Sequence, residues 1–168
     1  MKTSFIYCLI LLALPFAAYE QGKSDTLPSY LKESSIPPLN ILKTDSVTHF
    51  TNADLPKNMP VAIIYFNPDC SHCQFEAKEM ASHMDSLSNI FFVWVSYAKT
   101  MIDMRAFANK YGLSKFKNVV FGQDEKYFIP AYYKIAFTPY MAMYDTHGKI
   151  TKEFREGAKT SEILEGLQ

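Results

Sequence analysis

Cysteine is scarce in this chain of 168 residues, which contains only Cys8, Cys70 and Cys73. A structural zinc site needs four ligands, usually a second Cys-x-x-Cys pair or two suitably spaced histidines. No further cysteine follows Cys73, and His83 has no histidine partner at such a spacing. The shortage of ligands therefore argues against a zinc site, and we expect no bound metal.

Net charge is absent as well, because 17 basic residues balance 17 acidic residues and no long basic block occurs. A basic segment or surface is typical of proteins that bind nucleic acid or anionic membranes. We therefore expect no nucleic-acid partner. The 48% apolar content is that of a globular protein, and the length suits one domain with an appendage.

Long hydrophobic runs are missing too, apart from a short one near the N-terminus. Lys2 is followed by an apolar run from Phe5 to Ala18, and these 14 residues would span about 21 Å as a helix. That length falls short of the roughly 30 Å hydrocarbon core of a bilayer. A positive start, a short apolar stretch and small final residues are typical of an export signal. We predict that residues 1–18 are a signal peptide or an uncleaved N-terminal anchor.

The rest of the chain divides into a linker and one domain. Residues 19–36 are polar and predict a linker, and residues 37–168 are expected to fold. Residues 37–42 and 47–50, separated by a polar turn, predict a short β-hairpin. The apolar run 61–66 lies between two prolines and is typical of a strand buried on both faces.

Helical and strand patterns alternate through the middle of the domain. A helix is predicted from Cys70 to about Leu87, because apolar residues recur every three or four positions. Residues 90–95 predict a second buried strand, and a capping pattern at Thr100 predicts a helix over about 101–111. Those recurring apolar residues are Cys73, Ala77, Met80, Met84 and Leu87.

The C-terminal part predicts a short strand, a hairpin and a last helix. Residues 119–121 suggest a strand, and Pro130 could open a short helix. Residues 140–144 and 150–154 alternate around a turn and predict two antiparallel strands. Thr160 or Ser161 is expected to cap the final helix. This order of elements indicates an α/β fold, a mixed β-sheet with helices on both faces and an N-terminal β-hairpin.

The pair Cys70 and Cys73 is the strongest candidate for chemistry. A bond between them encloses only two residues, so it would constrain little of the unfolded chain. Cys70 directly follows a predicted buried strand and begins a predicted helix, where unpaired N–H groups and the helix dipole favour a thiolate. Cys73 lies one turn later on the apolar helical face. We therefore expect Cys70 to attack a substrate and Cys73 to resolve the mixed disulfide, forming a redox-active Cys70–Cys73 disulfide.

The strand, the turn Cys70-Ser-His-Cys73, the helix, and Phe137-Thr-Pro139 before the terminal hairpin together resemble thioredoxin-like proteins. The resemblance covers roughly residues 37–168, and it is strongest to the exported TlpA/ResA-type branch. In that family a cis-proline faces the disulfide, and Pro139 matches its position; the alternative is a trans proline in a loop. The resemblance implies that Thr138 and Pro139 orient an extended substrate peptide.

Two neighbours of the cysteines match further family features. His72 precedes the second cysteine, as in disulfide-donating relatives, and its imidazole could stabilise the thiolate; the alternative is a solvated histidine. Glu76 matches the acid of the TlpA/ResA-type pattern Cys-x-x-Cys-x-x-Glu and could exchange a proton with the resolving thiol. The alternative for Glu76 is an ordinary exposed glutamate.

The chain also departs from its relatives. Thioredoxin has a buried aspartate six places before the first cysteine, where this chain has Ile64, and reductive relatives usually have a proline between the cysteines. Both departures leave the direction of electron transfer open. Aromatic residues near the loop could line a substrate groove or simply belong to the core, and these are Tyr132, Tyr133, Phe137 and Tyr140.

These observations predict an exported, periplasmic or extracytoplasmic thiol–disulfide oxidoreductase that works without a cofactor. Its expected partners are proteins with thiols or disulfides and a redox partner that recharges the cysteine pair. One alternative is a Cu(I)-binding protein that uses the two thiolates with His72 or His147, although copper-delivery relatives usually have three residues between the cysteines. A peroxiredoxin-like peroxidase is the other, but Pro68 lies too close to Cys70 for its Pro-x-x-x-Thr/Ser-x-x-Cys loop.

Overall fold

The computed structural model describes residues 35–97 and 99–166. The predicted signal or anchor, residues 1–18, and most of the predicted linker, 19–36, lie outside this part of the chain. Ser35 and Ile36 are described, and both lie beside the turn of the C-terminal hairpin. Ser35 forms a β-bridge with Lys149, and the Ile36 N–H donates to the Gly148 carbonyl at 3.1 Å.

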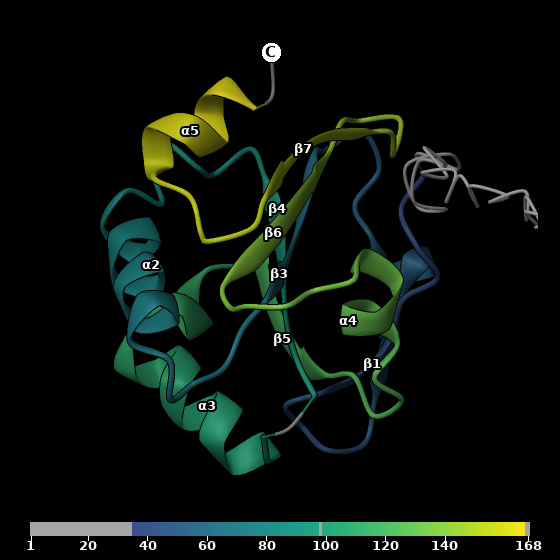
Figure 1. Ribbon diagram of the computed structural model, residues 1–168, viewed down its shortest axis with the longest axis vertical. Helices are drawn as coiled ribbons and strands as arrows, with labels where there is room; N and C mark the ends of the chain where they lie inside the picture. Colours follow the sequence, from purple (N-terminus) through teal and green to yellow (C-terminus); the bar gives the residue numbers. More distant parts are fainter. Residues whose placement is uncertain (1–34, 98, 167–168) are drawn as a thin grey trace, which may run out of the picture.

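The domain is a seven-stranded sheet between helices (Figure 1). The strands follow the order β2-β1-β5-β4-β3-β6-β7, in which the β3–β4 and β4–β5 pairs are parallel and the others are antiparallel. The strands are β1 (Asn40–Lys43), β2 (His49–Thr51), β3 (Val61–Tyr65), β4 (Phe91–Ser96), β5 (Val119–Gln123), β6 (Tyr140–Tyr144) and β7 (Ile150–Phe154). The helices are α2 (Ser71–Ser82), α3 (Met101–Lys110), α4 (Phe128–Tyr133) and α5 (Thr160–Glu165), with 3-10 turns at Asn52–Asp54 and Leu113–Lys115.

Helices cover both faces of the sheet, as the sequence predicts. Figure 1 shows α2, α3 and α5 on one side of the sheet and α4 on the other. The central strand β3 is buried on both sides, because alternate residues enter two separate cores: Ala62 and Ile64 face α2 and α3, while Val61 and Ile63 face α4. The mixed sheet, the N-terminal hairpin and the C-terminal hairpin are therefore confirmed.

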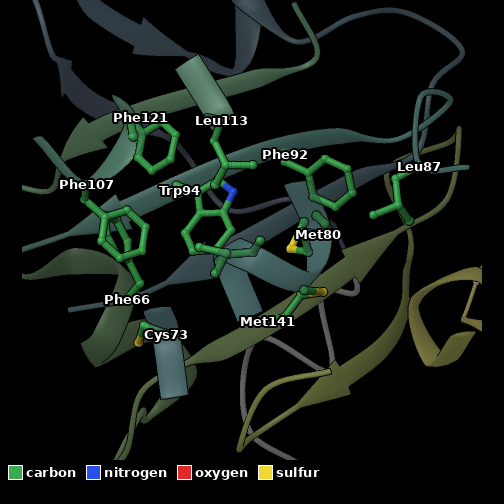
Figure 2. Close-up of a cluster of buried hydrophobic side chains, with 14 of the residues drawn as sticks. Phe66, Cys73, Met80, Leu87, Phe92, Trp94, Phe107, Leu113, Phe121 and Met141 are labelled. Atoms are coloured by element: carbon green, nitrogen blue, oxygen red, sulfur yellow. The ribbon is translucent and has the colours of Figure 1, made fainter. Parts of the chain in front are cut away.

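The core beneath α2 and α3 fixes the segment that carries the cysteines (Figure 2). Phe66, immediately after β3, packs edge-on against Trp94 with ring centroids 5.2 Å apart. Trp94 in turn stacks on Phe121 at 5.6 Å. Cys73 belongs to the same buried cluster. Both ends of the loop from residue 66 to residue 73 are thus anchored in one aromatic core, which limits movement of Cys70 between them.

Helix α2 is shorter than its apolar period predicts, because it ends at Ser82 and not near Leu87. The Ser82 hydroxyl donates to the Glu79 carbonyl at 2.8 Å, and the His83 ring nitrogen lies 2.9 Å from the same carbonyl. These side chains satisfy a carbonyl at the helix end and favour termination. A series of turns follows, and it still buries Met84 and Leu87 as the period predicts.

Three helix starts test the cap predictions. Thr100 caps α3, since its hydroxyl accepts the Asp103 N–H at 3.2 Å, which confirms the prediction. Lys159 precedes α5, so the predicted cap at Thr160 or Ser161 is wrong; the Glu162 carboxylate accepts the Lys159 N–H at 2.8 Å. Pro130 does not open α4 but is its third residue.

Candidate active site

Cys70 is the residue that precedes the first turn of α2. Its extended backbone, with φ −78° and ψ 122°, ends the loop that leaves β3. The loop is held by two hydrogen bonds to Asn67: its carbonyl accepts the Cys70 N–H at 3.0 Å, and its side-chain oxygen accepts the Asp69 N–H at 3.0 Å. The structure therefore places Cys70 at the helix N-terminus, where the sequence predicts it.

The environment of Cys70 favours its thiolate. Partial burial by itself raises the pKa of this thiol, but hydrogen bonds from the Cys73 backbone N–H, the Thr138 side chain and the His72 backbone N–H all lower it. The stabilising contacts outweigh burial, and the net pKa lies below the ordinary value. Because Cys70 is only partly covered, this sulfur is open to an external reactant.

Cys73 has the opposite character. Its side chain is 0% exposed and belongs to the core under α2. Burial raises the pKa of the Cys73 thiol to about 12, although the Asn67 backbone N–H, 3.5 Å from the sulfur, partly offsets that effect. The two sulfurs, three residues apart in sequence, therefore differ in both access and ionisation, which is the asymmetry that the sequence predicts.

The loop before β6 lies against Cys70. The Thr138–Pro139 peptide bond is cis, as the family resemblance implies. The Cys70 thiol donates to the Thr138 carbonyl at 3.4 Å, although 68 residues separate the two in sequence. The structure therefore brings Cys70, Thr138 and Pro139 together at one end of the sheet.

Glu76 is buried, so the alternative of an ordinary exposed glutamate is wrong. Its side chain is 3% exposed and lies one helical turn beyond Cys73 on the buried side of α2. Burial raises the pKa of the Glu76 carboxyl to about 7, and the Ala158 N–H, which donates to Oε1 at 2.8 Å, partly offsets that rise. Within the described residues, Oε2 is buried without a hydrogen-bond partner. A carboxyl that titrates near neutral pH can give and take a proton there.

A groove of about 280 Å³ opens beside the cysteines. His72 is exposed and borders the groove, so the structure is compatible with the solvated alternative. The contribution of His72 to the Cys70 thiolate comes from its backbone N–H. The groove is lined by His72, Phe75, Glu76, Pro139, Glu156, Gly157, Ala158, Lys159 and Glu162.

Most of the aromatic residues suggested for a substrate groove belong elsewhere. Tyr133 and Tyr140 are buried in the core on the α4 side of the sheet, and Tyr132 packs against that core. Phe137 is 73% exposed but does not line the groove. The large exposed ring in the groove is instead Phe75, which points outward from α2.

Sequence reasoning missed two parts of the site. An ion pair joins Lys99 to Asp69, the residue before Cys70. The loop before α5 supplies Gly157 and Ala158, which contact Pro139 and Glu76. A glycine shortly before a capped helix is a turn signal, but nothing local in the sequence relates position 158 to position 76.

The described ranges contain neither a cluster of metal ligands nor a membrane-spanning helix. Residues 35–97 and 99–166 contain no group of three or more histidine, cysteine or acidic side chains arranged to hold a metal ion. Within the same ranges, every helix is too short or too polar to cross a bilayer.

Comparisons with known proteins identify the fold. No protein-family model matches the sequence, and no curated protein matches it either. Among solved structures, DsbF from Mycobacterium tuberculosis is 22% identical with a TM-score of 0.65, over 79% of this chain and 96% of that one. A secreted M. tuberculosis disulfide oxidoreductase homologous to E. coli DsbE is 21% identical with a TM-score of 0.62, over 77% and 92%.

A thioredoxin-like protein from Aeropyrum pernix has a TM-score of 0.62 at 11% identity, over 80% of this chain and 89% of that one. At such identities, the likeness is one of fold. The chain has the thioredoxin-like fold, which confirms the fold that the sequence resemblance implies.

Proposed function

We propose that this thioredoxin-fold chain is an extracytoplasmic thiol–disulfide oxidoreductase of the TlpA/ResA type, with Cys70 and Cys73 as its redox pair. The observation that carries the proposal is the contrast between the two sulfurs. The pKa of the accessible Cys70 thiol is lowered, whereas that of the buried Cys73 thiol is raised to about 12. An exchanger needs one sulfur that attacks external disulfides and a second that reacts only with the first.

In the reductive direction, the Cys70 thiolate attacks one sulfur of a substrate disulfide. A bond forms between Cys70 Sγ and that sulfur, the substrate disulfide breaks, and the other substrate sulfur leaves as a thiolate. The Thr138 carbonyl lies 3.4 Å from Cys70 Sγ, and the backbone of a substrate bound at Cys70 would pass beside it. Pro139 has no N–H of its own, so the neighbouring backbone is available to an extended peptide.

Cys73 completes the exchange. Its thiol gives a proton to the ionised carboxyl of Glu76, and the resulting thiolate attacks Cys70 Sγ. The Cys70–Cys73 disulfide forms and the second substrate thiolate leaves, so the substrate gains two electrons and the pair loses two. Glu76 suits this role because its pKa of about 7 lets it accept a proton at neutral pH and release it again. The reverse sequence oxidises substrate thiols.

Export is supported by the N-terminal sequence and by one structural neighbour, which is a secreted protein. Outside the cytoplasm a disulfide can persist, and the pair then requires a partner protein that returns it to its starting state. The proposed substrates are proteins with thiols or disulfides. Mass spectrometry of the exported product would reveal whether residues 1–18 are removed.

Serine variants of the two cysteines test the proposed roles. We expect Cys70→Ser to reduce insulin no faster than the uncatalysed reaction, because the attacking sulfur is lost. We expect Cys73→Ser to retain substrate as a mixed disulfide, visible as an added mass on Cys70. Cys8→Ser in the full-length chain is the matched control and should match the unmodified protein. Undiminished insulin reduction by Cys70→Ser would refute the proposal.

The reduction potential decides the direction of transfer. Stabilising the Cys70 thiolate favours the reduced pair and raises the reduction potential, so the potential reports how strongly the site favours an oxidant. A redox titration against glutathione measures it. A value close to about −120 mV, that of DsbA, would assign an oxidant. A value close to about −270 mV, that of thioredoxin, would assign a reductant.

A further inference from the structure

The loop between β7 and α5 forms one side of the groove beside the cysteines. Its residues Glu156 to Lys159 line this groove together with Glu76 and Pro139. At the centre of the loop, Gly157 has φ +88°, a left-handed conformation that residues with a side chain rarely adopt. The loop therefore reaches the groove through a position that favours glycine.

Gly157 packs closely against two functional residues. A Cβ atom at this position would lie 3.0 Å from Cγ of Pro139 and 3.5 Å from Oε1 of Glu76. The first distance is shorter than an ordinary contact between carbon atoms, so a side chain here would push the loop away from the proline. The absence of a side chain thus lets the loop cover the Glu76 carboxyl while it touches Pro139.

Ala158 supplies the polar half of the same contact. Its backbone N–H donates to Oε1 of Glu76 at 2.8 Å, across 82 residues of sequence. The carboxyl has Oε2 buried without a partner among the described residues, and its side chain is 3% exposed. The loop therefore both shields the carboxyl from water and fixes the direction of one of its oxygens.

We propose that Gly157 and Ala158 are positioning residues that hold the Glu76 carboxyl in its buried, oriented place, one helical turn beyond the resolving residue Cys73. This inference rests on the proposed exchange function, because it assigns the loop a part in the proton transfer of the Cys73 step. The same loop residue, Gly157, packs against both Glu76 and Pro139, and all three residues line the groove where a substrate would lie.

Displacing the loop should lower the pKa of the Glu76 carboxyl, because the loop both buries this group and donates a hydrogen bond to it. Burial is the larger influence on Glu76 and raises the pKa of its carboxyl, while the Ala158 N–H is the smaller influence and lowers it. Displacing the loop removes both, so the pKa should fall towards its ordinary value. The titratable groups that line the groove with this carboxyl are His72 on α2, Glu156 and Lys159 in the loop, and Glu162 on α5; Cys73 lies one turn before Glu76 on α2.

The test compares Gly157→Ala with Gly148→Ala. Gly148 also has a positive φ, +76°, but among the described residues a Cβ there would meet only Ile36, at 3.7 Å, which is an ordinary contact. The Glu76 carboxyl is titrated by carbon-13 NMR in the reduced full chain, and its signal is assigned by its loss in Glu76→Gln. We expect Gly157→Ala to lower the midpoint by about one pH unit or more, and Gly148→Ala to leave it unchanged.

The pH dependence of insulin reduction is measured on the unmodified protein, Gly157→Ala and Gly148→Ala. Its inflection near neutral pH should shift by the same amount as the Glu76 midpoint, and only in Gly157→Ala. If Gly157→Ala does not fold, Gly157→Asn and Gly148→Asn replace the pair, because asparagine tolerates a left-handed backbone. An unmoved midpoint in the Gly157 variant, or equal shifts in both, overturns the inference. Loss of exchange activity in the unmodified chain would instead overturn the proposed function.

Discussion

Iodoacetamide should alkylate Cys70 of the reduced protein at least about 30 times faster than Cys73 at neutral pH. The pKa of Cys70 lies below 9.0 and that of Cys73 is about 12, so the thiolate fractions differ by more than about a thousandfold. A thiolate of higher pKa is the better nucleophile, so each Cys73 thiolate is intrinsically about 16 to 32 times more reactive than a Cys70 thiolate, which partly offsets the difference in thiolate fraction. The remaining ratio is a lower limit, because Cys73 is also 0% exposed.

Mass spectrometry of peptides from timed reactions measures the two rates separately. The unfolded protein in denaturant is the control, because both thiols should then react at similar rates. The ratio of the two rates should narrow once the pH exceeds the pKa of Cys70, because the Cys70 thiolate then approaches its maximum while the Cys73 thiolate is still increasing. Equal rates in the folded protein would remove the asymmetry on which the proposed exchange chemistry rests.

The fold was largely predictable from local patterns, because periodicity reports burial directly. The run 61–66 predicts a strand buried on both faces, and β3 sends alternate residues into two cores. The end of helix α2 was harder to predict from the sequence. Met84 and Leu87 keep the helical spacing and are buried, yet they lie in turns beyond Ser82. Spacing predicts which residues are buried, whereas the end of the helix depends on side-chain hydrogen bonds at Ser82 and His83.

The site was predictable where its residues are neighbours in sequence or match a known motif. Cys70 and Cys73 follow from the strand–turn–helix order, and Pro139 follows from the family resemblance. The environment of Glu76 could not be derived in this way. Its hydrogen bond comes from Ala158, 82 residues later, and the loop that carries Ala158 also helps to bury the carboxyl. The loop comes this close to Glu76 through the positive φ of Gly157. Such contacts arise only when the C-terminal hairpin and α5 have packed.

Glu76 should make the protein less stable as the pH rises. The carboxyl has a pKa of about 7 in the folded state because it is buried, against about 4.5 when unfolded. Below the unfolded value it is protonated in both states and has no effect. Between the two values the unfolded state loses its proton first, so unfolding becomes easier; above the folded value the penalty is constant. A shift of this size corresponds to about 3 kcal/mol.

Glu76→Gln isolates this effect, because glutamine keeps the shape of the side chain but does not titrate. The free energy of unfolding is measured by denaturant titration of both reduced proteins from about pH 4 to about pH 9. The stability of the unmodified protein relative to Glu76→Gln should fall by about 3 kcal/mol over that range, mostly between the two pKa values. Glu165→Gln, at an exposed position on α5, should show no such trend. A relative stability that stays flat with pH would mean that the Glu76 carboxylate is solvated in the folded protein, and the buried proton acceptor assigned to the Cys73 step would be lost with it.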